Sequence, residues 1–348
     1  MIKAALKMSL IALVALVLMF GLAYQTEWVQ NTLFDAGTRK MMEQRASIFN
    51  GLRVVVCGSA SPLGADPDRA QACIAVLTPE HFFIFDVGAR SPLRLRQARL
   101  PLDRLDGVFL THYHSDHIAA LPDVNLASWV QGRKTGLKVY GPAGIERVVG
   151  GFNEAFALDR QYRTAHHGEV LLPAVAGPMS AEAIDAGKTV WQDESLSIQA
   201  FTVDHSPVTP AVGYRVDYRG RSVVISGDTL ATDTLFEAAS GADLVIHDAL
   251  SRKMLERMIH VATDLEVPVI PQIMKDVMDY HADSLSLEER AKKAGIRQLA
   301  YYHLVPVPPN DLAMKLFVRG LKSETILVSD LQTFDLPPDS DAIEITYP

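Results

Sequence analysis

The chain has 348 residues, of which 48% are hydrophobic and 21% are charged, and its formal net charge is -8. This length and composition are ordinary for a globular protein and are enough for one large core or two smaller ones. Proteins that bind nucleic acid usually carry a basic face, which the acidic balance does not suggest. We therefore expect a small molecule to be a better partner for this chain than nucleic acid.

The N-terminus has the pattern of an export signal or a membrane anchor. Lys3 and Lys7 precede an uncharged run from Met8 to Thr26. The length of this run fits both a signal cleaved after Ala23 and a membrane-spanning helix. We expect residues 1–25 to be a signal peptide or an anchor, which would make the membrane a partner if it stays uncleaved. The rest of the chain would be exported, either periplasmic or anchored in the inner membrane and facing the periplasm.

Residues 26–50 are expected to form a helical connecting segment, and residues 51–348 a single hydrolase domain. Short apolar runs that end in turn residues predict strands at 53–57, 72–77, 82–86, 107–110, 137–140, 196–203, 213–218, 222–225 and 244–246. Helical patterns lie near 118–131, 143–157, 231–239, 251–263, 267–279 and 286–294. Ser286 and Glu289 form a capping box that would start the last of these helices. Strands that first form hairpins and then alternate with helices predict an α/β fold, with sheets covered by helices on both sides.

The chain has two cysteines, one at the end and one at the start of two predicted strands, Cys57 and Cys73. Export would permit a disulfide between them, because such bonds form in oxidising compartments. The alternative is a pair of small buried thiols, and the sequence leaves both open. It also leaves the oligomeric state open, with a homodimer among the alternatives.

The most informative stretch is the run His112-Tyr-His-Ser-Asp-His117. His112 and His114 are two positions apart at the end of a predicted strand, so their side chains would point the same way. Asp116 and His117 follow where the chain turns, and they can face a second point in space. Imidazole and carboxylate are the ligand types that suit Zn²⁺ and similar divalent ions. The alternative, a polar loop rich in histidine by accident, is disfavoured by the further candidate ligands that occur later in the chain.

Four further polar residues each end an apolar strand later in the chain, His205, Asp228, His247 and His303. Ligands often gather at strand ends because that edge of a sheet opens to solvent. A lone histidine in such a place is more often structural. Four residues in the same context, added to the run at 112–117, favour a two-metal site.

This set of residues resembles the metallo-β-lactamase superfamily, over about residues 52–336. The resemblance implies a four-layer αββα sandwich with two divalent ions at one edge, zinc first and manganese or iron as alternatives. By the resemblance, the first ion is held by His112, His114 and His205, the second by Asp116, His117 and His303, and Asp228 bridges them. It also implies that Asp86, in Phe85-Asp-Val-Gly88, anchors the ligand loop from behind.

Within the superfamily, Gly58-Ser-Ala-Ser-Pro62 and Ile246-His-Asp-Ala249 resemble ribonuclease Z and the related arylsulfatases. The histidine of the second motif assists catalysis in that branch. The resemblance therefore assigns His247 as a proton donor or transition-state stabiliser, supported by Asp248, while Asp116 orients the water. The alternative for His247 is a core histidine that is bonded to a backbone carbonyl.

Ribonuclease Z grips transfer RNA with a protruding basic arm rich in Gly and Pro, and residues 141–195 show no such segment. Arg160, Tyr162 and Arg163 are candidates to bind an anionic group of the substrate, or else they form a solvated helix end. The pair His166-His167 would line the substrate pocket or lie in a surface loop. His281 is a candidate neighbour of the metals, with a helix-cap role as its alternative.

Two divalent ions lower the pKa of a water from about 15.7 toward 7, so hydroxide forms at neutral pH and attacks an ester. The sequence therefore favours a dinuclear-metal hydrolase that cleaves phosphodiester or sulfate-ester bonds in a small anionic substrate. No organic cofactor is implied, because the chain lacks a phosphate-cradling glycine loop. The alternatives are a ribonuclease Z-type endonuclease that processes the 3' end of transfer RNA, a lactonase, and a non-catalytic binding module on the same fold.

Overall fold

The computed structural model describes residues 13, 17–43, 46–64, 66–322 and 324–348. The chain divides into two compact units, Met1–Ala46 and Ser47–Pro348. Most of the predicted signal or anchor lies outside the described residues. Among those that are described, no helix combines the length and the apolar character needed to cross a membrane.

The two units differ in how much they bury. Helix α2 (Glu27–Glu43) of the first unit has no buried residue. The main hydrophobic cluster, by contrast, runs from Leu52 to Leu336 and lies wholly within the second unit. Because Ser47–Pro348 contains a complete core, we expect it to fold without the segment that precedes it.

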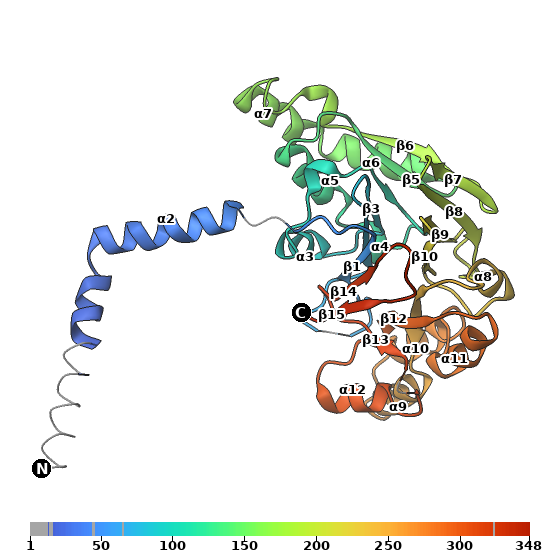
Figure 1. The fold of residues 1–348 in the computed structure, drawn as a ribbon. Helices are drawn as coiled ribbons and strands as arrows, with labels where there is room; N and C mark the ends of the chain where they lie inside the picture. The colour runs from blue at the N-terminus through green and yellow to red at the C-terminus, as the bar shows by residue number, and fades with distance from the viewer. Residues whose placement is uncertain (1–12, 14–16, 44–45, 65, 323) are drawn as a thin grey trace, which may run out of the picture. The chain divides into compact units, whose positions relative to one another are not determined.

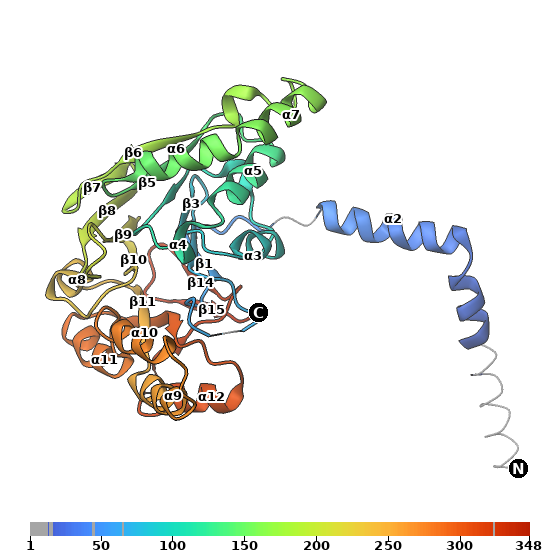
Figure 2. The same cartoon turned by 180° about the vertical axis from the view of Figure 1, so that it is seen from behind.

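The second unit contains two sheets, which Figures 1 and 2 show from opposite sides. The first sheet has the order β15-β14-β1-β2-β3-β4-β5-β6. Its strands are β1 (Leu52–Gly58), β2 (Cys73–Leu77), β3 (Phe82–Phe85), β4 (Gly107–Phe109), β5 (Leu137–Gly141), β6 (Met179–Ala183), β14 (Thr333–Leu336) and β15 (Glu344–Thr346). The second sheet has the order β13-β12-β11-β10-β9-β8-β7. Its strands are β7 (Lys188–Gln192), β8 (Leu196–Thr202), β9 (Val212–Tyr218), β10 (Arg221–Ile225), β11 (Leu244–Leu250), β12 (Gln298–Val305) and β13 (Ile326–Leu327).

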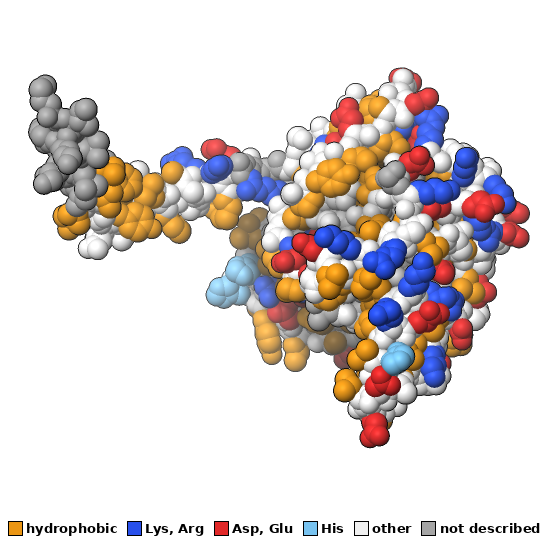
Figure 3. Space-filling model, turned by 90° about the horizontal axis from the view of Figure 1, so that it is seen from below, with side chains coloured by type: hydrophobic (Ala, Val, Ile, Leu, Met, Phe, Trp, Pro, Cys, Tyr) orange, Lys and Arg blue, Asp and Glu red, His pale blue; other side chains and the backbone are white. Residues whose placement is uncertain are grey.

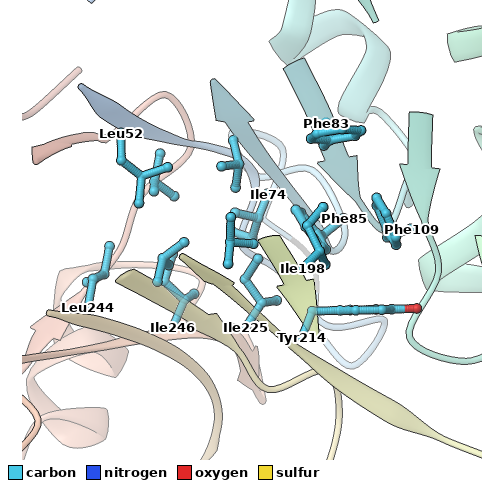
Figure 4. Close-up of a cluster of buried hydrophobic side chains, with 14 of the residues drawn as sticks. Leu52, Ile74, Phe83, Phe85, Phe109, Ile198, Tyr214, Ile225, Leu244 and Ile246 are labelled. Carbon is cyan, nitrogen blue, oxygen red and sulfur yellow. The ribbon is translucent and has the colours of Figure 1, made fainter. Parts of the chain in front are cut away.

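The core lies between the two sheets, as Figure 4 shows. Ile74 and Phe85 of the first sheet lie in one buried cluster with Ile198 and Ile246 of the second. Burial of such large apolar side chains is the main force that holds two sheets face to face. The aromatic rings add specific packing, since Phe85 lies 5.3 Å from Tyr214 across the interface, measured between ring centroids.

Helices cover the outer faces of both sheets. On the first sheet, α3 (Ser91–Gln97) lies against β1, and α6 (Ile145–Ala155) lies against β5 and β6. On the second, side chains of α8 (Asp233–Ala238), α9 (Arg252–Asp264), α11 (Ser284–Lys293) and α12 (Asp311–Phe317) share one buried cluster with Val245 and Leu299 of the sheet. Two mixed sheets between helical layers confirm the predicted α/β sandwich.

Two local features answer questions that the sequence raised. Cys57 and Cys73 lie on the antiparallel pair β1–β2 and form a disulfide, with their Cα atoms 4.9 Å apart. The predicted capping box at Ser286 is wrong, because α11 begins at Ser284. Its N-cap is Asp283, whose carboxylate accepts the backbone N–H of Leu285. A carboxylate satisfies a free amide at a helix start as well as a serine does, so the pattern alone did not fix the residue at which the helix begins.

Candidate metal centre

The run at 112–117 begins after β4 and continues into the short helix α4 (Ser115–Ile118). His112, Asp116 and His117 are buried, whereas His114 is exposed at the N-cap of α4. The helix turns the chain immediately after His114. The two halves of the run therefore face different points, as the sequence predicted.

The first half joins a cluster of four residues whose ligand atoms all lie within 4.8 Å of one another, His112, His114, His205 and Asp228. His114 Nδ1 lies 3.1 Å from His112 Nε2 and 3.3 Å from His205 Nε2. His205 follows β8, which brings the other sheet to this edge. Its second nitrogen is held by the backbone carbonyl of Tyr280, 3.0 Å away.

The second half joins another such cluster, Asp116, His117, Asp228 and His303. Asp116 Oδ2 lies 2.9 Å from His303 Nε2, and Asp228 Oδ2 lies 3.2 Å from His117 Nε2. Asp228 belongs to both clusters and so occupies the bridging position. The structure thus brings all seven predicted metal ligands to one edge of the sandwich, contributed by strand β12, helix α4 and loops that follow strands of both sheets.

The side chains at this edge fit metal ions. Asp228 Oδ1 and His303 Nδ1 are buried and lie 3.4 Å apart, without a hydrogen bond among the described residues. Buried polar atoms without hydrogen bonds are costly, and a cation that coordinates them offsets that cost. The donor set of histidine nitrogens and carboxylate oxygens is the one that suits zinc in hydrolytic sites. The two buried clusters are therefore consistent with a dinuclear metal site.

A bulge in β12 aims His303 at the second cluster. Asp248 of β11 pairs with Tyr302, but the next residue, Ala249, pairs with Leu304, so the register skips His303. His303 also has a left-handed backbone, with φ 44°. Such bulges redirect one side chain out of the alternation of a strand. Without the bulge, His303 would follow the regular alternation of β12.

Asp86, which follows β3, holds the ligand loop from behind. Its Oδ1 accepts the backbone N–H of Thr111, and its Oδ2 accepts the Thr111 hydroxyl, both at 2.8 Å. Oδ2 also lies 2.8 Å from Nδ1 of His117. A carboxylate on one ring nitrogen fixes the tautomer and leaves the other nitrogen for a metal. Asp86 thus has the geometry of the anchor that the resemblance implied.

The electrostatics of the clusters favour the metal-binding forms of His112, Asp116 and Asp228, whereas the neighbouring carboxylates raise the pKa values of His117 and His303. Burial and the neighbouring imidazoles hold the pKa of His112 well below its ordinary value. Burial alone would raise the pKa of Asp116, but interactions with His117 and His303 outweigh it and lower that pKa. The pKa of Asp228 is also lowered, since His117 and His303 overcome the effect of burial. Ionised carboxylates and a neutral His112 are the forms that coordinate divalent ions.

The structure does not bring His247 to the metal clusters. The ring is fully buried, its Nδ1 lies 2.7 Å from the backbone carbonyl of Asp248, and its Nε2 has no partner among the described residues. His281 instead lines the pocket beside the metals, together with Asp116 and His303. The backbone carbonyl of the alternative for His247 is present, and so is the predicted contact with the Asp248 carboxylate, whose Oδ1 lies 2.9 Å from the same nitrogen.

Asp248 connects to the pocket through His281 rather than through His247 alone. Asp248 Oδ2 lies 2.8 Å from His281 Nδ1, and the two residues form a third cluster with Asp228. The His281 ring lies 5.4 Å from that of His303, measured between centroids. The sequence signal for this residue was weak, because His281 follows no strand and belongs to none of the predicted motifs.

Two cavities open at the site. One, of about 260 Å³, is lined by Asp116, Asp228, His281 and His303. A larger one, of about 560 Å³, shares Tyr280 and His114 with it. The walls of the larger cavity are aliphatic and acidic, with Pro207, Val208, Ile273, Asp276 and Asp279. These two cavities are the spaces through which a substrate could reach the candidate metal ligands.

The basic and histidine candidates at 160–167 lie elsewhere. They belong to α7 (Ala157–His167), which has no buried residue and lies near the upper tip of the molecule in Figure 1. Arg163 pairs with Asp159, and Arg160 donates to the backbone carbonyl of Asn153. None of the candidates lines either cavity at the metals. Where a basic Gly/Pro-rich arm was sought, the structure has a helical segment.

The sequence comparisons agree on one protein superfamily. Residues 84–281 match the beta-lactamase superfamily domain family. A ribonuclease Z of Mycobacterium bovis is 34% identical over 258 residues, which cover 73% of this chain and 86% of that protein. A ribonuclease Z of Mycobacterium marinum is 33% identical over 258 residues and is covered to 87%.

Solved structures share the fold at lower identity. The short form of human tRNase Z has a TM-score of 0.59 and 19% identity, and the match covers 82% of this chain and 99% of that one. A metallo-beta-lactamase fold protein from Bacillus subtilis has a TM-score of 0.58 and 19% identity, with coverage of 82% and 100%. The Zn²⁺-bound PqqB of Methylobacterium extorquens has a TM-score of 0.55 and 16% identity, with the same coverage. At these identities the likeness shows the fold.

Proposed function

Because the chain belongs to the metallo-β-lactamase superfamily, in its ribonuclease Z-like branch, we propose that it is a metal-dependent phosphodiester hydrolase whose first candidate substrate is RNA. The observation that carries the proposal is the pair of buried clusters that share Asp228, with the Asp248–His281 pair beside them. The sequence analysis favoured a small ester. The relatives named ribonuclease Z support the endonuclease alternative better than that interpretation.

In this site the two ions, when bound, supply positive charge that polarises an ester and activates a water. His112, His114 and His205 would hold one ion, and His117 and His303 the other, with Asp228 between them. Asp116 lies within the second cluster, where its carboxylate can hold and orient a water by accepting its proton in a hydrogen bond.

We assign the proton transfer to the leaving group to His281. With Nδ1 held by the Asp248 carboxylate, a protonated His281 has Nε2 free to donate to the departing oxygen. The pair resembles the base-and-orienter geometry of other hydrolases, in which a carboxylate fixes the tautomer of a histidine. His281 lines the metal pocket, so it is placed to serve an ester held there.

The test is a substrate panel with the purified chain, loaded with zinc or manganese or treated with a chelator. The panel contains a precursor transfer RNA, bis(p-nitrophenyl) phosphate, p-nitrophenyl sulfate and a lactone. We expect metal-dependent cleavage of the two phosphodiesters and none of the lactone, with His114→Ala as the inactive control. A metal-loaded chain that cleaves no phosphodiester would contradict the proposal.

A small diester or sulfate ester is the second candidate, favoured by one specific observation. Asp276 and Asp279 line the larger cavity beside the metal ligands, where they would repel a polyanion. The Cys57–Cys73 disulfide also supports export, away from the transfer RNA of the cytoplasm. Faster turnover of bis(p-nitrophenyl) phosphate or p-nitrophenyl sulfate than of RNA would favour this candidate.

A further inference from the structure

The face formed by α9 and α12 carries a concentration of unpaired cations. Lys253, Arg257, Lys315 and Arg319 are all exposed, and none of them has an ion-pair partner among the described residues. Three of them, Lys253, Arg257 and Arg319, line a hollow of about 380 Å³ between the two helices, in which Glu256 is the one carboxylate. Seen from below, this side of the molecule shows grouped Lys and Arg side chains (Figure 3).

This arrangement differs from that of most arginines in the same unit. Arg53 pairs with Asp335, Arg221 with Asp243, and Arg290 with Asp233. In a chain of net charge -8, these four cations outnumber the exposed acids of α9 and α12, which are Glu256, Asp264 and Asp311, so the local charge is opposite in sign to the whole. Charge complementarity therefore calls for an anionic surface.

Large aliphatic side chains continue the same helical stripes. On α9, Lys253, Arg257 and Val261 follow one another at intervals of four residues, and Leu265 is the C-cap four residues later. Val261 and Leu265 are 56% and 70% exposed. On α12, Leu312 is 70% exposed and lies three positions before Lys315, on the same side of the helix, while Arg319 follows just after the helix ends at Phe317. Exposed aliphatic residues beside lysines and arginines are the composition of a surface that rests on lipid headgroups.

We propose that this basic–aliphatic face, formed by Lys253, Arg257, Lys315, Arg319, Val261, Leu265 and Leu312, docks on an anionic phospholipid surface. RNA is the other polyanion to consider. Sites that bind single-stranded nucleic acid stack bases on aromatic side chains, whereas Phe317 of α12 is buried and the exposed His260 ring of α9 is paired with Asp264. The sequence adds a second lipid signal, the apolar N-terminal run, and stable attachment commonly takes two. The proposal does not depend on which ester the metal site cleaves.

The test uses residues 47–348, which contain the complete core, so that the N-terminal run does not contribute to binding. Flotation would compare vesicles of phosphatidylcholine alone with vesicles that also contain phosphatidylglycerol. We expect binding to the anionic vesicles only, with weaker binding as salt is raised. The triple variant K253E/R257E/R319E should bind at least about 100-fold more weakly, since each cation contributes roughly fivefold.

Two matched variants and one competing ligand decide the outcome. R96E/K138E/R147E changes the charge equally at exposed positions elsewhere and should keep vesicle binding. L265S/L312S should weaken vesicle binding while leaving the binding of a single-stranded RNA unchanged. Equal loss in both triple variants, no preference for anionic vesicles, or weaker binding of single-stranded RNA with unchanged vesicle binding in K253E/R257E/R319E would overturn the proposal. Circular dichroism and melting temperatures would establish that each variant is folded.

Discussion

Asp228 is the residue that the two clusters of candidate metal ligands share. It is the only member of the two four-residue clusters that belongs to both, and one of its oxygens lacks a hydrogen-bond partner among the described residues. A bridging carboxylate offsets the charge of two neighbouring cations, so its loss should weaken both sites. A ligand that serves one cluster alone should affect one ion more than the other.

We therefore predict that Asp228→Asn lowers the affinity for both ions by at least about 100-fold, which exceeds the usual effect of residues behind the ligands. His205→Ala, by contrast, should leave the second ion bound more tightly than the first. Zinc titration monitored by calorimetry would measure both. Asp204→Asn, an exposed neighbour of His205, is the matched control. Retention of two tight sites in Asp228→Asn would show that the bridging assignment is incorrect.

His247 and His281 both contact the Asp248 carboxylate, and their different positions give a second prediction for single residues. His281→Gln should lower kcat by roughly 10²–10⁴-fold, the usual contribution of a general acid, with the metal content unchanged. His247→Gln should change kcat little, because His247 does not line the metal pocket. Steady-state kinetics on bis(p-nitrophenyl) phosphate, together with metal analysis, would measure this. If His247→Gln proved the more damaging to turnover, the original assignment of His247 as proton donor would stand.

At the scale of elements, the strand pair β1–β2 is fastened by the Cys57–Cys73 disulfide, which encloses a loop with a sequence separation of 16 residues. β1 lies in the interior of the first sheet, between β14 and β2. The loop leads back to the ligand-bearing edge, because Gln71 donates its backbone N–H to Ala89, just after Asp86. The crosslink therefore restrains chain close to the anchor of the ligand loop.

Replacing both cysteines by alanine should lower the free energy of unfolding by about 3 kcal/mol, the usual entropic effect for a loop of this length. Denaturant unfolding of the wild-type chain and of C57A/C73A, each with and without a reducing agent, would measure the loss. The reducing agent should destabilise only the wild-type chain. Equal stability of the wild-type chain and C57A/C73A in the absence of the reducing agent would mean that the crosslink contributes nothing.

At the scale of the whole molecule, charge is distributed unevenly. The chain is acidic overall, the larger cavity beside the metals has Asp276 and Asp279 on its wall, and the unpaired cations gather on α9 and α12. A polyanion approaching the metal pocket therefore meets two carboxylates. This field bears directly on the choice between RNA and a small ester.

We predict that D276N/D279N raises kcat/KM for an RNA substrate several-fold at low salt, and that added salt removes the gain. Turnover of bis(p-nitrophenyl) phosphate should change less, since it carries a single charge. D185N/D339N, which neutralises two exposed carboxylates away from the cavity, is the control. An unchanged kcat/KM for RNA would show that these carboxylates do not select the substrate.

Much of the site was predictable because metal chemistry restricts residue types. The run at 112–117 and the strand-end residues His205, Asp228 and His303 were all expected ligands, and the structure brings them together. His281 was expected as a candidate neighbour of the metals, but not as the partner of Asp248, since the sequence does not show that the loop before α11 reaches β11. The bulge at His303 was equally invisible, because it depends on the register of β12 against β11.

The sequence by itself indicated the family, the α/β sandwich and the set of candidate metal ligands, because apolar periodicity and ligand chemistry are local properties. Only the tertiary structure decided that Asp248 meets His281, that Cys57 meets Cys73, and that Lys253, Arg257 and Arg319 line one hollow. Each of these depends on how segments distant in the chain pack together. That packing is set by the burial of the whole core, and a local pattern does not contain it.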